Sequence, residues 1–71
     1  MTYTTNPKPS TSDAFRAGSL DGAADASDGV YLPTWSNPWI DEAKGTVLDH
    51  ELASAYADGY TSAHAAIPAR W

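Results

Sequence analysis

Small and apolar side chains recur every three to four residues over positions 13–26, a spacing that is typical of an amphipathic helix. Ser12 is the predicted N-cap of this helix, and Gly29 is its predicted stop signal. On a helical wheel, one narrow strip holds Phe15, Gly18, Ser19, Gly22 and Ala26. The opposite side is predicted to hold the acidic residues Asp21, Asp25 and Asp28. We therefore expect this helix to bury its strip and to expose its acids.

A second helical pattern covers positions 47–66. Thr46 and Asp49 have the spacing of a capping box at its start, and Pro68 prevents its continuation. Its apolar stripe consists of Leu48, Leu52, Tyr56, Gly59, Tyr60, Ala63 and Ile67. The pattern predicts a long helix that packs along this stripe.

The two predicted helices share a local pattern, which is seen when "AFRAGSLDGAA" (14–24) is aligned with "AYADGYTSAHA" (55–65). In each, an alanine and an aromatic residue precede a glycine, and another small residue follows one turn later. A glycine inside a helix costs about 1 kcal/mol relative to alanine, so Gly18, Gly22 and Gly59 require a packing reason. We predict an all-α fold, a two-helix antiparallel hairpin with its glycine faces in contact.

The segment between the helices carries two of the chain's three tryptophans. Residues 30–32 are apolar and precede a proline, which favours an extended connector over a paired strand. The loop "PTWSNPW" follows, and in it Asn37 and Pro38 have the form of a helix N-cap and its first residue. They predict a short third helix over residues 38–44 that ends at Gly45.

Residues 1–11 are predicted to form a flexible N-terminal tail, because Pro7 and Pro9 exclude a regular helix or ladder there, and residues 12–71 a single helical domain. The start of the chain lacks the apolar stretch of a secretory signal, and no apolar run reaches the roughly 18 residues of a membrane span. The chain has no cysteine, so no disulfide bond can stabilise the fold. We expect a soluble, cytoplasmic protein that is stabilised by packing or by a partner.

Charge limits the class of partner. Nine acidic residues against four basic ones give a formal net charge of -5, which disfavours direct binding to nucleic acid and favours a basic protein face. The acidic stripe of Asp21, Asp25 and Asp28 has two interpretations, a solvated helix face and a docking surface. Both remain open at this point.

Histidines and serines give no pattern of an active site. The stretch "DHELA" begins like the helix of a zinc protease, in which two histidines one turn apart hold one metal ion. Ser54 stands in place of the second histidine, and His64 lies roughly 21 Å along the helix from His50. No serine is set apart as a nucleophile by a neighbouring base. We expect no catalytic residues, no metal site and no cofactor.

Small and aromatic residues follow one another in a defined order along the chain. The order is Ala14, Gly18 and Gly22, then Asn37, Pro38 and Trp39, then Tyr56, Gly59, Tyr60 and Ala63. It resembles the ribosome modulation factor family, which has two helices joined by a loop with an aromatic residue after a proline. The family's namesake binds the ribosome and silences it in stationary phase, so the resemblance implies a ribonucleoprotein partner. The longer segment between Trp39 and Tyr56 and the scarcity of basic residues differ from that family, and we expect its fold rather than its RNA binding to carry over.

Trp35 and Trp39 are the strongest candidates for a binding site, because tryptophan is over-represented among the residues that dominate protein interfaces. At least one of them is expected to fold back and complete the core of so small a chain. Which one closes the core is not determined by the sequence pattern.

These observations favour a small non-enzymatic binding protein that acts by occupying a site on a larger protein or assembly. Its predicted partner-binding residues are Trp35, Trp39, Asp21, Asp25 and Asp28. Two alternatives remain, an acidic mimic of nucleic acid that inhibits a DNA- or RNA-binding protein, and a structural homo-oligomer or assembly component.

Overall fold

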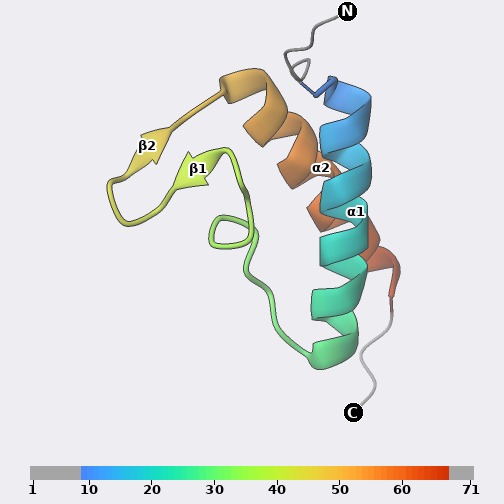
Figure 1. The fold of residues 1–71 in the computed structure, drawn as a ribbon. Helices are drawn as coiled ribbons and strands as arrows, with labels where there is room; N and C mark the ends of the chain where they lie inside the picture. The colour runs from blue at the N-terminus through green and yellow to red at the C-terminus, as the bar shows by residue number, and fades with distance from the viewer. Residues whose placement is uncertain (1–8, 68–71) are drawn as a thin grey trace, which may run out of the picture.

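A computed structural model describes residues 9–67 of the 71-residue chain. These residues form two α-helices and a small antiparallel sheet, in the order α1 (Thr11–Asp28), β1 (Ile40–Asp41), β2 (Thr46–Val47) and α2 (His50–Ala66) (Figure 1). The predicted two-helix, mainly α fold is confirmed. Neither helix in the described part of the chain is long and apolar enough to cross a membrane.

A capping box fixes the start of α1. The Ser10 side chain accepts a hydrogen bond from the Asp13 amide, and the Asp13 side chain accepts one from the Ser10 amide. The N-cap is therefore Ser10 and not Ser12, because only Ser10 forms this reciprocal pair. At the other end Gly29 ends the helix as predicted, with a left-handed φ of 77°. Thr11 belongs to α1, and residues 1–8 of the predicted tail lie outside the described residues.

α2 begins later than its sequence pattern predicts. Asp49 is the N-cap, and its side chain accepts a hydrogen bond from the Leu52 amide. Thr46 is not part of a cap, because it pairs with Asp41 in the sheet. The Leu48 amide donates to the carbonyl of Trp39, which keeps this part of the chain out of the helix.

The two helices run parallel, and the prediction of an antiparallel hairpin is wrong in this respect (Figure 1). A Cβ built on Gly18 would overlap the Tyr56 carbonyl, and one turn later a Cβ on Gly22 would overlap the Tyr60 carbonyl. From Gly18 to Gly22 on α1, the contacted residue on α2 changes from Tyr56 to Tyr60. Residue numbers therefore increase in the same direction along both helices, which defines a parallel pair. The reason lies in the connection of residues 29–49, which returns along the helices before α2 starts.

The predicted contact between glycine faces is confirmed, and it is reciprocal. Gly18 packs against the backbone of Tyr56, while Gly59 packs against the backbone of Phe15. In the shared sequence pattern Gly18 corresponds to Gly59, and Phe15 corresponds to Tyr56. The helix pair is therefore approximately two-fold symmetric, in the close parallel packing that small residues one turn apart permit.

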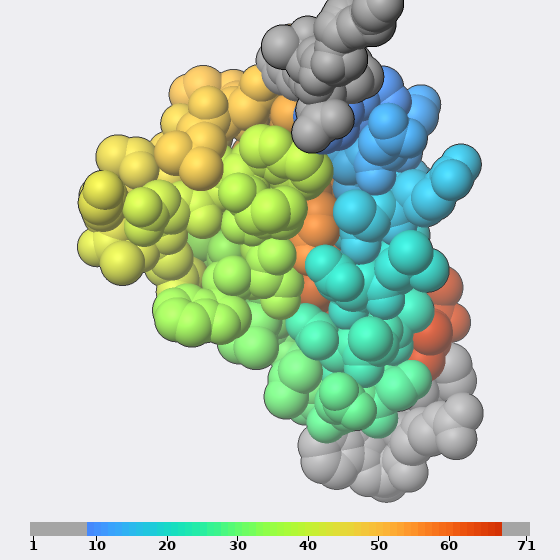
Figure 2. Space-filling model, viewed as in Figure 1, coloured from blue at the N-terminus to red at the C-terminus, as the bar shows by residue number. Residues whose placement is uncertain are grey.

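The connection between the helices breaks this symmetry. It packs on the side of Tyr56 and Tyr60, and both of these side chains are 0% exposed. Phe15, the counterpart of Tyr56, is 44% exposed, so its predicted burial is wrong. On the face shown in Figure 2, residues 29–49 lie over the middle of α2, which is visible as an orange strip beside α1, while the C-terminal part of α2 (red) is visible on the other side of α1. The main cluster of the core is formed by Ala14, Leu52, Tyr56 and Tyr60.

Candidate functional site

The chain leaves α1 as an extended connector, as predicted, and two side chains of α2 fasten it. The Leu32 amide donates to the Tyr60 hydroxyl at 2.8 Å, and the Val30 carbonyl lies 2.7 Å from Nε2 of His64. The Tyr31 ring meets the His64 ring edge to face, with the ring centroids 4.9 Å apart. These contacts direct the following loop back along the helix pair.

Two tyrosine–aspartate pairs join α2 to α1. The Tyr56 hydroxyl donates to Asp21, and the Tyr60 hydroxyl donates to Asp25, which also accepts from Oγ of Ser36 at 3.3 Å. Burial, followed by these hydrogen bonds to carboxylates, raises the pKa of both tyrosines.

The placement of these acids differs from the prediction. Asp21 and Asp25 lie at the edge of the helix contact and not on the opposite face, because the tyrosines of α2 reach them. Asp28 is exposed at the end of α1. The three carboxylates therefore do not act as one free acidic stripe.

Asn37 anchors the loop to α2. Its side chain is 2% exposed, its Nδ2 donates to the Ala53 carbonyl at 3.0 Å, and its Oδ1 accepts from the Trp39 amide at 3.0 Å. A buried amide whose donor and acceptor are both used stabilises one loop conformation. The sequence pattern predicts Asn37 as the N-cap of a helix. In the structure its side chain instead stabilises a turn that packs against α2.

The short third helix predicted for residues 38–44 is absent from the described structure, and a β-hairpin takes its place. Ile40 pairs with Val47 across the hairpin. The turn is closed by the Lys44 amide, which donates to Oδ1 of Asp41 at 3.1 Å, and by Gly45 at a φ of 68°. Ile40 and Val47 are both β-branched, and such residues favour a strand over a helix.

The two tryptophans of the loop have different environments. The Trp39 ring is half-buried and meets Tyr56 at a centroid distance of 6.1 Å and an interplanar angle of 63°. Trp35 is 69% exposed. Trp39 therefore closes the core, and Trp35 is left at the surface.

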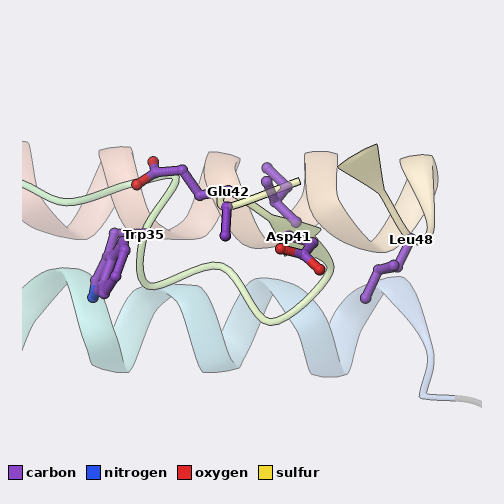
Figure 3. Close-up of a pocket in the computed structure, with 6 residues that line it drawn as sticks. Trp35, Asp41, Glu42 and Leu48 are labelled. Carbon is purple, nitrogen blue, oxygen red and sulfur yellow. The ribbon is translucent and has the colours of Figure 1, made fainter. Parts of the chain in front are cut away.

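Trp35 lines an open hollow of about 340 Å³ between the loop and the hairpin (Figure 3). We call this feature the Trp35 hollow, and its lining residues are Trp35, Ile40, Asp41, Glu42, Ala43 and Leu48. Leu48 is 67% exposed and lies across the hollow from Trp35; in this view the Asp41 carboxylate lies between them, and the Glu42 side chain extends toward the Trp35 side. The hollow therefore combines apolar walls with negative charge.

Sequence reasoning finds only Trp35 among these six residues. The others belong to the hairpin, whose existence was obscured by the helix-like form of Asn37 and Pro38. A signal for it was present in the glycine at position 45, which stands between the β-branched residues Ile40 and Val47. Within residues 9–67, no group of three or more His, Cys, Asp or Glu side chains is placed to hold a metal ion.

Comparisons of the chain with models of protein families, with curated proteins and with solved structures gave no match. The resemblance to the ribosome modulation factor family stays a prediction.

Proposed function

We propose that this protein is a non-enzymatic binding module that docks onto a larger protein or assembly through the Trp35 hollow. The observation that carries the proposal is the exposure of Trp35, at 69%, beside a concave surface of about 340 Å³. Tryptophan is enriched among residues that dominate binding energy, and such residues act by filling or lining pockets.

Trp35 has no role in the core that would explain its presence. The core already has Trp39, which packs on Tyr56, and the loop is held by buried Asn37. Trp35 and Leu48 instead leave most of their apolar surface in water, at 69% and 67% exposure. Exposed apolar side chains that line one hollow with a polar rim are typical of interaction sites.

The proposed contact set differs from the one that the sequence suggests. Trp39 is not included because its ring packs on the core. Asp21 and Asp25 are not included because they accept hydrogen bonds from tyrosines. Asp28 remains exposed, but it lies at the far end of α1 from the hairpin (Figure 1). The same observations weigh against the alternative of a nucleic-acid mimic, since two of its three carboxylates are engaged within the fold.

A matched pair of variants tests the proposal. Trp35→Ala removes the exposed ring of the hollow, and Leu20→Ala removes a side chain of similar exposure, 66%, from α1. The full-length chain and both variants are immobilised and incubated with a lysate of the source cells, and the captured proteins are identified by mass spectrometry. We expect at least one partner that the unaltered chain and Leu20→Ala retain and that Trp35→Ala loses by about tenfold or more.

Circular dichroism of each variant confirms that the fold is kept. If Trp35→Ala captures the same proteins in the same amounts as the unaltered chain, the Trp35 hollow is not the docking site and the proposal is wrong.

A further inference from the structure

We propose that the Trp35 hollow binds a basic segment of a partner protein, in which an apolar anchor residue is flanked by lysine or arginine. This inference rests on the proposed function and specifies the chemistry of the partner. It follows from the pairing of apolar walls with unneutralised carboxylates in one small concavity.

The apolar part of the hollow sets the size of the anchor. Trp35, Ile40 and Leu48 supply large apolar side chains around a space of about 340 Å³. This volume is at the lower limit of pockets that take small molecules, which are about 300 to 1,000 Å³. The hollow is also open to solvent, so it suits one or two side chains of a segment that lies across it.

The charged part of the hollow sets the flanking residues. Oδ1 of Asp41 accepts a hydrogen bond from the Lys44 amide, which leaves its negative charge in place. The Glu42 carboxylate has no hydrogen bond or ion pair with any other residue in the described part of the chain. A partner that covered both acids with apolar groups alone would remove them from water without compensation. Lysine or arginine beside the anchor supplies that compensation.

The charge of the whole chain acts in the same direction. Its formal net charge is -5, from nine acidic and four basic residues. This field increases the rate at which a basic segment meets the hollow, and it repels acidic segments and phosphate backbones.

A second copy of this chain is a poor occupant. A two-fold contact would bring the same patch of both copies together, so the Asp41 and Glu42 carboxylates of both copies would lie in one small interface. Like charges in such a contact are destabilising. The structure therefore favours a different protein over self-association at this surface.

Three short synthetic peptides test the inference by fluorescence anisotropy against the full-length chain. The first is an amphipathic peptide of leucines and lysines, the second has glutamates in place of the lysines, and the third has serines in place of the leucines. We expect the leucine–lysine peptide to bind about tenfold or more tightly than either of the others. Trp35→Ala should weaken its binding by a similar factor.

Paired charge variants then locate the binding. The double variant Asp41→Asn with Glu42→Gln removes both carboxylates of the hollow and keeps their shape, and we expect it to bind the leucine–lysine peptide about fivefold or more weakly. The control is Glu51→Gln with Asp58→Asn, which removes the same charge from exposed positions of α2. It should bind like the unaltered chain.

Several results would overturn the inference. They are equal binding of the glutamate peptide, equal weakening by both double variants, or no binding of the leucine–lysine peptide up to about 1 mM. In any of these cases the proposed function stands if Trp35→Ala still loses its partner in the capture experiment. If that capture is unaffected by Trp35→Ala, the proposed function fails independently of the peptide results.

Discussion

The α1–α2 contact and the Trp35 hollow use their side chains in opposite ways. At the helix contact the chain has glycine where most helices have larger residues, and the backbones of Gly18 and Tyr56 meet with no room for a Cβ. At the hollow the chain keeps two of its large apolar side chains, Trp35 and Leu48, mostly in water. The comparison indicates that the fold is stabilised at the first surface, while the second is available for another molecule.

Asn37 separates these two regions within a single loop. On its C-terminal side Trp39 packs on Tyr56, and on its N-terminal side Trp35 remains exposed. Because the Asn37 side chain bonds both Ala53 and the Trp39 amide, it fixes which ring faces the core. Predictions that alter either region should therefore have separable effects on stability and on binding.

The largest effect is expected at the helix contact. Gly18→Ala places a Cβ that would lie 2.9 Å from the carbonyl carbon of Tyr56, so the helices must separate. We expect a loss of about 3 kcal/mol or more in the free energy of unfolding, measured by urea denaturation with circular dichroism. Gly45→Ala is the control, because a Cβ there meets nothing within 4 Å. Its left-handed backbone should limit the loss to about 1 to 2 kcal/mol. Equal losses in the two variants would mean that the helices do not pack this closely.

A smaller loss is expected where the loop is anchored. Asn37→Ala removes the donor to the Ala53 carbonyl in a buried site and leaves the part-buried Trp39 amide without its acceptor. We expect a loss of about 2 kcal/mol in the same denaturation experiment. Ser36→Ala removes one hydrogen bond of 3.3 Å from the next residue and should cost about 0.5 kcal/mol or less. If the two variants are equally stable, Asn37 does not determine the position of Trp39.

The sequence predicts the helices and their glycine contact because these depend on local spacing. The positions of Gly18, Gly22 and Gly59 indicate that backbones must approach closely, and they do. The direction of α2 was not predictable in the same way, because a helical wheel defines a face and not an orientation. Either direction brings glycine faces together, and the long connection of residues 29–49 decides between them.

The candidate site was predictable only in part. Tryptophan composition indicates an interface, but the different burial of Trp35 and Trp39 depends on the hydrogen bonds of Asn37 to residues elsewhere in the fold. Likewise, the pairing of Asp21 with Tyr56 joins residues far apart in sequence, and no local pattern reveals it. Because of such long-range contacts, acids that the sequence pattern places on the surface belong to the helix contact.

Alkaline pH provides a moderate perturbation of the two tyrosine–aspartate pairs that join the helices. The pKa values of Tyr56 and Tyr60 are raised in the folded protein above the ordinary value of 10.0. The unfolded chain therefore releases these protons first as the pH rises. Their contribution to stability is complete below about pH 10 and declines above it, by about 1 kcal/mol for Tyr56 between pH 10 and pH 11 and by a further amount for Tyr60. Thermal denaturation across this range measures the decline.

Two tyrosine variants show whether the decline comes from the helix contact. Tyr56→Phe removes one of the titrating hydroxyls and should reduce the slope of stability with pH. Tyr31→Phe removes a hydroxyl from a side chain that is 56% exposed, and it should leave the slope unchanged. A slope that Tyr56→Phe does not change would assign the alkaline transition to other groups.

The smallest effect on stability is expected at the hollow, from the change that should have the largest effect on binding. Trp35→Ala removes a ring that is 69% exposed and should alter the free energy of unfolding by about 0.5 kcal/mol or less. Trp39→Ala removes the ring that packs on Tyr56. It should lower the free energy of unfolding by about 2 kcal/mol or more, because removal of the ring leaves a cavity. Urea denaturation of the two variants under the same conditions compares them directly. If Trp35→Ala destabilises the protein as much as Trp39→Ala does, Trp35 is part of the fold and its exposure does not indicate a binding surface.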